Sequence, residues 1–250
     1  VCMAAEELRS PVILAHYVNT GAYSGHDWFY ETAKWMAAKV SVPVAIHLDH
    51  GDSFERCMEM LKLGFTSIMF DGSALPVEEN AAATEAVARV CRSFGVPLEA
   101  EIGELCRLDD KGNKMGASNI ADPDVVRQYL KLCHPDSLAI GIGNAHGFYN
   151  GPVDIRAEVL EECRKFTDIP FVLHGCTGMD EELVKRSIDS GVTKINFGTQ
   201  VRCQYVNYLK EGLAEGKDQG HAWRLSQYAE LRLREDIKDI IRLAGSQEKA

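Results

Sequence analysis

The sequence contains no apolar run that approaches the roughly 20 residues required to span a membrane, and no secretory signal peptide. Positive charge is scarce, because 27 Lys and Arg residues stand against 37 Asp and Glu residues, a formal net charge of −10. This balance argues against a general surface for nucleic acids or anionic membranes. We therefore expect a cytoplasmic protein with neither partner, in which a local group of residues holds any anionic ligand.

Closely spaced cysteine pairs are also absent, since no C-x-x-C motif occurs among the eight cysteines. Several of the cysteines lie in apolar stretches that resemble helices or strands. Free, buried thiols in a reducing compartment explain this distribution better than a disulfide framework does.

Continuous apolar strands alternate with amphipathic helices along the chain. The expected strands cover residues 12–17, 43–49, 67–72, 97–103, 137–143, 170–174 and 194–199. The expected helices lie near residues 27–40, 53–63, 77–94, 123–133, 153–166, 180–190 and 200–215. Such alternation is typical of a parallel sheet covered by helices. Four of the strands follow a proline, namely Pro11, Pro43, Pro97 and Pro170.

Two α/β architectures fit this pattern, an open doubly wound sheet and a closed barrel. A doubly wound sheet gathers its ligand groups at one switch point, whereas here polar residues end nearly every strand. We therefore predict a (β/α)8 TIM barrel that forms a single domain over residues 1–250, with a first strand that would precede Val1. A helical extension is expected at about 216–245, packed on the barrel or on a partner subunit. Residues 104–121 lack apolar periodicity and are predicted to form a lid.

Three of the strands lead to histidines that are each followed by glycine, namely His50, His146 and His174. Neutral imidazole is the commonest zinc ligand, and three imidazoles leave the fourth position open, as in catalytic zinc sites. A single histidine at a strand end is more often structural, but three at equivalent places favour a metal. Asp49 and His50 are both expected to face the mouth of the barrel, with His47 as a supporting donor.

Two turns rich in small residues, 175–178 and 196–199, follow the last two strands. Either turn alone could be an ordinary tight turn, but barrels of this type bind phosphate with backbone N–H groups at this position. A metal, a carboxylate and a phosphate anchor suit retro-aldol cleavage of a phosphorylated ketone.

Five motifs resemble, in order and spacing, those of the class II zinc-dependent ketose-bisphosphate aldolases. They are residues 47–51, 99–103, 145–147, 173–175 and 194–196. The resemblance implies a dimeric or tetrameric barrel that reversibly cleaves a ketose 1,6-bisphosphate of the fructose or tagatose type to dihydroxyacetone phosphate and an aldehyde. It also implies that His50, His146 and His174 bind the catalytic zinc, and that Asp49 serves the C4 hydroxyl of the sugar.

Further ligands are implied by the resemblance alone. Asp71 and Glu101 match positions that hold a second divalent metal or an alternative zinc position. The positions that match the site for phosphate and a monovalent cation, Na⁺ or K⁺, are Gly147, Gly175, Cys176, Thr177, Asn196, Phe197, Gly198 and Thr199.

The chain departs from the family pattern in three places. Cys176 stands in a turn that usually reads Gly-Gly-Ser-Gly or Gly-Ala-Ser, and residues 16–19 replace a small-residue turn. The mobile loop lacks Gly-Gly-x-Glu-Asp, so the base that deprotonates dihydroxyacetone phosphate stays open between Asp109 and Glu104. The substrate could therefore be another 1-phosphorylated ketose, such as a sulfonated sugar or a deoxy sugar acid. A metal-dependent hydrolase and a non-catalytic sugar-phosphate sensor are the alternatives.

Overall fold

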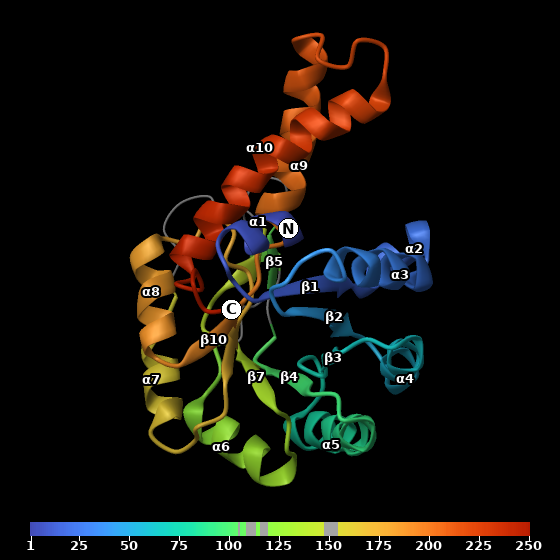
Figure 1. The fold of residues 1–250 in the computed structure, drawn as a ribbon. Coiled ribbons are helices and arrows are strands. Elements are labelled where there is room, and N and C mark those ends of the chain that lie inside the picture. Colours follow the sequence, from blue (N-terminus) through green and yellow to red (C-terminus); the bar gives the residue numbers. More distant parts are fainter. Residues whose placement is uncertain (105, 109–113, 116–119, 148–154) are drawn as a thin grey trace.

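The centre of the molecule is a curled parallel sheet (Figure 1). The structure is a computed structural model that describes residues 1–104, 106–108, 114–115, 120–147 and 155–250. Within this part of the chain the sheet has seven strands in the order β1-β2-β3-β4-β7-β9-β10. Their bounds are β1 Val12–Tyr17, β2 Val44–Gly51, β3 Ser67–Phe70, β4 Leu98–Ile102, β7 Ser137–Ile140, β9 Phe171–Leu173 and β10 Val192–Ile195. The fold is thus an α/β, TIM-barrel-like fold, as predicted.

Prolines mark the beginnings of four of these strands, as the sequence predicts. β1, β2, β4 and β9 each start at the residue after Pro11, Pro43, Pro97 and Pro170. Proline has no backbone N–H and disfavours the helical conformation of the residue before it, so it ends the preceding helical segment and begins extended backbone.

Six helices cover the outer face of the sheet (Figure 1). They are α3 His26–Ala37, α4 Phe54–Leu63, α5 Val77–Phe94, α6 Pro123–Leu132, α7 Glu158–Arg164 and α8 Glu181–Asp189. Side-chain oxygens of Ser53, Asp122 and Asp180 accept backbone N–H bonds at the first turns of α4, α6 and α8. Apolar residues of the strands and of the inner helix faces form the two main core clusters, one containing Leu138 and Ile140 and the other Leu48 and Ile68.

The two remaining long helices form a hairpin that projects beyond the sheet (Figure 1). They are α9 Thr199–Ala214 and α10 Ala222–Leu243. α10 packs on α9 and, through Ile237 and Ile241, on the short helix α1 Cys2–Glu7. No helix in the described ranges has both the length and the apolar character needed to cross a membrane.

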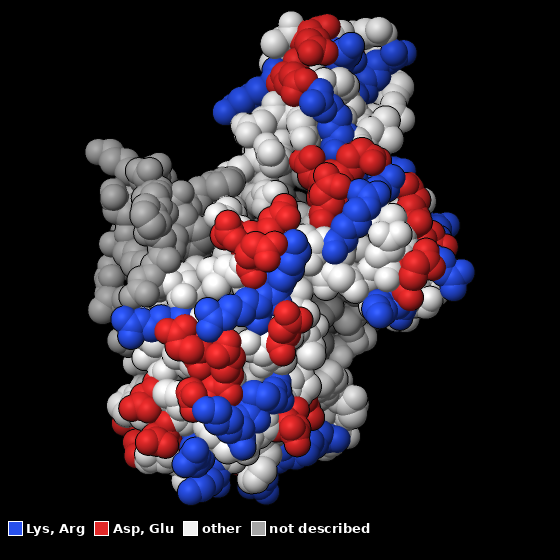
Figure 2. Space-filling view, turned by 90° about the vertical axis from the view of Figure 1, so that its left-hand side faces the viewer, with Lys and Arg blue, Asp and Glu red and all other residues white. Residues whose placement is uncertain are grey.

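Charged side chains of both signs are interspersed over the face that carries α7 and α8 (Figure 2). Arg186 on α8 is 2.8 Å from Glu161 on α7, and Lys165 pairs with Glu162 at 2.5 Å. Acidic side chains on this face are therefore partly neutralised by nearby Lys and Arg side chains.

Several predicted boundaries were wrong. β10 ends at Ile195 and α9 begins at Thr199, so residues 196–198 form a turn and not the end of a strand. Between the expected strand 12–17 and the expected helix near 27–40, the chain forms the 3-10 helix η1 Val18–Thr20 and the short helix α2 Gly21–Ser24. α7 starts at Glu158, later than predicted.

Part of the predicted lid forms a small second sheet. β5 Cys106–Leu108 and β6 Lys114–Met115 join β8 Ala145–His146 in the order β6-β5-β8. Pairing of Arg107 with His146 connects this segment to a candidate metal ligand. Residues 105, 109–113 and 116–119 of the predicted lid, Asp109 among them, lie outside the described residues, whereas Glu104 is exposed and Ala121 is buried.

Candidate active site

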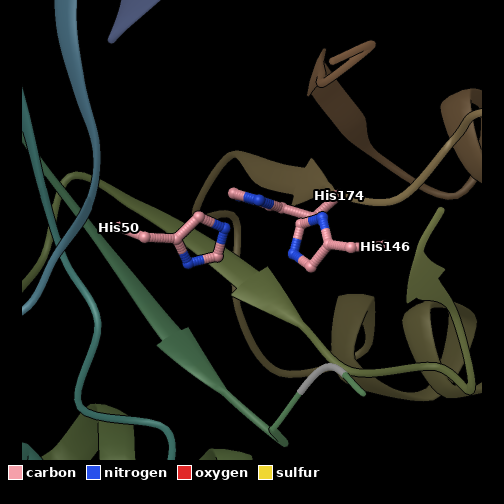
Figure 3. A group of neighbouring side chains, drawn as sticks. All are labelled: His50, His146 and His174. Atoms are coloured by element: carbon pink, nitrogen blue, oxygen red, sulfur yellow. The ribbon is translucent and has the colours of Figure 1, made fainter. Parts of the chain in front are cut away.

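Three imidazoles converge at the carboxyl ends of the strands (Figure 3). The ring centroid of His50 is 5.0 Å from that of His146 and 4.9 Å from that of His174, and the last two are 6.0 Å apart. One donor nitrogen of each ring lies within 4.8 Å of the other two. His50 Nε2 is buried and has no hydrogen-bond partner among the described residues.

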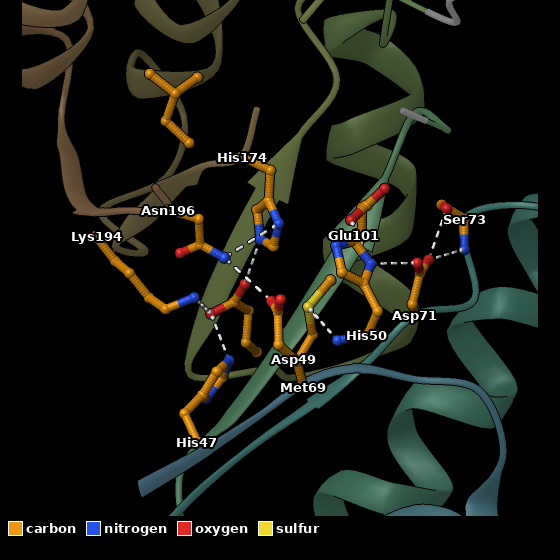
Figure 4. A network of polar contacts seen from close by, with 12 residues as sticks. His47, Asp49, His50, Met69, Asp71, Ser73, Glu101, His174, Lys194 and Asn196 are labelled. Carbon is orange, nitrogen blue, oxygen red and sulfur yellow. Dashed lines mark hydrogen bonds and ion pairs between the residues drawn. The ribbon is translucent and has the colours of Figure 1, made fainter. Parts of the chain in front are cut away.

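The end of β2 places two functional side chains side by side. His50 has a φ of 54°, a left-handed conformation that is uncommon for a residue with a side chain. The register between β2 and β3 also shifts between Leu48 and Gly51. This local turn interrupts the strict alternation of the strand, so that both Asp49 and His50 face the site (Figure 4). Strain of this kind is common at functional sites.

The donor set suits zinc. Zinc binds histidine nitrogens at about 2.0–2.1 Å in tetrahedral geometry, so two such ligands lie roughly 3.4 Å apart. Donor atoms that already lie within 4.8 Å of one another need only a small contraction. The buried Nε2 of His50 would also gain a partner in this way. The three histidines can therefore hold a metal and leave one position open.

A second group of possible ligands shares His50. Its Nδ1 lies 2.7 Å from Asp71 Oδ2 and 3.7 Å from Glu101 Oε2. Asp71 is held in place by Ser73, whose backbone N and Oγ donate to Oδ1 at 3.1 and 2.6 Å. Donor atoms of His50, Asp71 and Glu101 also lie within 4.8 Å of one another.

The electrostatics of this second group favour a cation. Burial opposes protonation of His50, but the hydrogen bond to Asp71 and the charges of Glu101 and Asp49 outweigh it and raise the pKa of His50 to about 9. Burial and the neighbouring charge of Asp71 raise the pKa of Glu101 to about 8. Hydrogen bonds from His50 and Ser73 hold the pKa of Asp71 well below its ordinary value, so the raised pKa values belong to His50 and Glu101, whose protons a divalent cation would replace.

Asn196 connects the carboxylate beside the histidines to one of them (Figure 4). Its Nδ2 donates to Asp49 Oδ1 at 3.1 Å and lies 3.3 Å from His174 Nδ1. The predicted general acid–base residue and a predicted metal ligand are therefore held by one side chain from the turn after β10.

The two predicted phosphate turns are joined to each other. Gln200 N, in the first turn of α9, donates to Thr177 Oγ1 at 3.1 Å. Gly175 has a φ of 68°, and a Cβ there would lie 2.4 Å from the carbonyl oxygen of Ala145. Only glycine fits this approach. The N-terminus of α9 at Thr199 adds a positive dipole end beside these turns.

Cys176 fits this turn in a way the sequence did not indicate. Its side chain is buried, and Sγ donates to the carbonyl oxygen of Leu173 at 3.5 Å. Burial raises the pKa of the Cys176 thiol, so the side chain stays neutral. The thiol points into the core instead of crowding the turn, since Cys176 belongs to the cluster around Leu173.

Comparison with known proteins assigns the chain to one enzyme family. The family model described as "Fructose-bisphosphate aldolase class-II" matches residues 1–249. The chain belongs to this family. It is accordingly an enzyme of the lyase class.

Individual relatives of this class II aldolase agree with the assignment. A "Probable fructose-bisphosphate aldolase" of Bacillus subtilis (strain 168) is 36% identical to it over 100% of the chain and 88% of the relative. Among solved structures, the YdjI aldolase of Escherichia coli K12 has a TM-score of 0.84 at 29% identity and covers 100% of this chain and 87% of that one. A putative fructose-1,6-biphosphate aldolase of Coccidioides immitis has a TM-score of 0.86 at 26% identity and covers 99% and 87%.

Two residues of the class II aldolase site lie within the family motifs, but the sequence alone assigned them no role. Glu99 is buried inside β4, and Lys194 on β10 approaches it to 2.8 Å. Both lie two residues before a predicted site residue, Glu101 and Asn196 respectively, and Glu99 shares the face of β4 that carries Glu101. That period of two was the signal available in the sequence.

Proposed function

We propose that this class II aldolase is zinc-dependent and reversibly cleaves a ketose 1,6-bisphosphate of the fructose or tagatose type, or a close analogue, to dihydroxyacetone phosphate and an aldehyde. The observation that carries the proposal is the convergence of three imidazoles beside the carboxylate of Asp49. A cytoplasmic location and a homodimeric or homotetrameric assembly are part of the proposal.

In this proposal His50, His146 and His174 hold the metal. Zinc bound there would act as a Lewis acid on the ketone of the substrate. Asp49 would take the proton of the C4 hydroxyl as the C3–C4 bond breaks, and would return it in the direction of synthesis. Asn196 orients Asp49 through its 3.1 Å hydrogen bond, so that the carboxylate is positioned before the substrate binds.

The phosphate of the substrate would bind between the two joined turns. Gly147, Gly175 and Thr177 form one side, and the turn from Asn196 to Thr199 forms the other. Backbone N–H groups suit an anion on an acidic protein, because they add no formal charge. A monovalent cation beside the phosphate, and a second divalent metal at Asp71 and Glu101, complete the proposed ligands.

The far end of the substrate is a second question, raised by Tyr17. This residue stands where the family usually has a small side chain, and its ring centroid lies 6.1 Å from that of His50. Asn19 Nδ2 donates to its hydroxyl at 2.9 Å. A bulky side chain here changes the space around the metal site. Other 1-phosphorylated ketoses, such as sulfonated sugars or deoxy sugar acids, are therefore also candidate substrates.

The test is an assay of triose phosphate release from a panel of 1-phosphorylated ketoses, with added zinc and with a chelator. We expect turnover with at least one ketose, and its loss with chelator and in His174→Ala, which should also lose bound zinc by elemental analysis. Release of inorganic phosphate without triose phosphate would indicate a hydrolase instead. Thermal stabilisation by a ketose phosphate without turnover would indicate a sensor.

A further inference from the structure

We propose that Glu99 and Lys194 form a buried ion pair that positions His174 for metal binding, an inference that rests on the zinc site proposed above. Lys194 Nζ lies 2.8 Å from Glu99 Oε2, and His174 Nε2 lies 2.8 Å from Glu99 Oε1. The side chain of Glu99 is 2% exposed and that of Lys194 is 12% exposed. One carboxylate thus bridges a lysine and a candidate metal ligand inside the barrel.

Hydrogen-bonding rules fix the proton on His174. The carboxylate of Glu99 can only accept, so His174 Nε2 carries the hydrogen. An imidazole that ligates a metal is neutral. A neutral ring with hydrogen on Nε2 has its lone pair on Nδ1. This is the nitrogen that faces Asn196, and it is the one left for the proposed metal because Nε2 is bonded to Glu99.

The role of Lys194 follows from the cost of burying charge. A buried carboxylate without a counter-ion is strongly unfavourable, and Lys194 supplies the counter-ion for Glu99 at 2.8 Å. His47 also approaches Glu99, but its Nε2 lies 3.7 Å from Oε2, a longer contact than the 2.8 Å of Lys194. Within the described residues, Lys194 is therefore the cation that keeps Glu99 an acceptor.

Stability alone does not explain this pair. A buried ion pair is often no more stabilising than well-packed apolar residues of similar volume. Its additional contact to His174 supplies a function, because an acceptor behind a ligating imidazole sets the orientation and basicity of the ring. The backbone of His174 is fixed as well, since Asn144 Nδ2 donates to its carbonyl oxygen at 2.7 Å.

The decisive variant replaces the ion pair by apolar residues, Glu99→Leu with Lys194→Met. We expect zinc affinity, measured by competition with a chromogenic chelator, to fall about 10- to 100-fold. The melting temperature of the metal-free protein should stay the same or rise. A purely structural role predicts the opposite pattern, with lower stability and unchanged affinity.

A second variant tests whether the acceptor itself is responsible. Glu99→Gln with Lys194→Met retains a neutral oxygen that can accept a hydrogen bond from His174 Nε2. Its zinc affinity should therefore lie much closer to that of the wild type than to that of the Leu/Met variant. Thr84→Val is the matched control. Thr84 is also fully buried and hydrogen-bonded, to Asn80 and Tyr129, so its replacement should lower stability without changing zinc affinity.

The tautomer can be read directly from long-range ¹H–¹⁵N NMR spectra of the metal-free wild-type protein. Hydrogen on Nε2 of His174 is expected, and hydrogen on Nδ1 would overturn the inference even if every variant failed to fold. Unchanged zinc affinity in the Leu/Met variant would overturn it too. Failure of the proposed function is a separate result, because then His174→Ala would bind zinc as the wild type does.

Discussion

At the scale of single residues, the catalytic role of Asp49 can be tested separately from metal binding. It is bonded to Asn196 and lies beside the histidine cluster without belonging to either set of candidate ligands. We expect Asp49→Asn to lower kcat by about 10²- to 10⁴-fold, because the amide cannot take the proton of the C4 hydroxyl. Zinc content by elemental analysis should be unchanged.

Asp52→Asn is the control for this prediction. It makes the same chemical change three residues further along, at a side chain that is 58% exposed, and should leave kcat close to the wild-type value. Normal turnover in Asp49→Asn would remove Asp49 from the reaction.

The functional residues at strand ends could be predicted from the sequence, whereas the buried residues that hold them in position could not. His50, His146 and His174 stand out because each follows an apolar run and precedes glycine. Glu99 and Lys194 lie within strands, where their spacing from Glu101 and Asn196 was the local signal, but that spacing does not show that the two side chains pair. Their roles depend on which strands face each other across the curled sheet, and this is a property of the whole sheet.

At the scale of secondary-structure elements, a chain of hydrogen bonds with only one possible direction joins α4, α3 and β1. Arg56 can only donate, so His26 Nε2 accepts from it at 2.9 Å and His26 Nδ1 donates to His16 Nε2 at 2.8 Å. His16 Nδ1 then faces Thr20 Oγ1 at 3.4 Å, and that hydroxyl donates to the carbonyl oxygen of Tyr17 at 2.7 Å. Both imidazoles must be neutral for this chain to form.

This chain predicts a loss of stability in acid. Burial, followed by the neighbouring His26 ring and the positive charge of Arg56, lowers the pKa of His16 from 6.5 to about 4. Between these values the unfolded state takes up a proton that the folded state does not, so the free energy of unfolding falls as the pH decreases through this window. His16→Phe keeps the stacking on Phe29 and removes this proton uptake.

Urea unfolding at a series of pH values between about 7 and 4 checks this prediction, since the wild type should lose more stability than His16→Phe over that range. His134→Gln is the control, because His134 is 72% exposed, and its pH dependence should match that of the wild type. Equal pH dependence in His16→Phe and the wild type would contradict the prediction.

The beginnings of elements were predicted better than the segments between them. A proline acts on its immediate neighbours, so the starts of β1, β2, β4 and β9 follow from local sequence. The small sheet of β5, β6 and β8 depends instead on pairing between Arg107 and His146, which are far apart in the chain. Short segments without a hydrophobic period give no local signal for such pairing.

At the scale of the whole molecule, the two ends of the chain are packed together. Ala4 and Ala5 of α1 contact Ile237 and Ile241 of α10 in a separate small core. Ion pairs of Glu7 with the α10 side chains Lys238 and Arg234 flank this core. The projecting α9–α10 hairpin is thereby anchored at its base (Figure 1).

Ile241→Ala tests this anchor. The side chain is 6% exposed, so its truncation should lower the free energy of unfolding by about 2–5 kcal/mol, as measured by urea unfolding, while zinc content stays unchanged. Leu231→Ala on the same helix is the matched control. Leu231 is 52% exposed in the single chain, and its truncation should change stability by no more than about 0.5 kcal/mol. A large, concentration-dependent loss in Leu231→Ala would instead show that a second copy covers the hairpin, and light scattering should then give a mass that falls toward that of one chain.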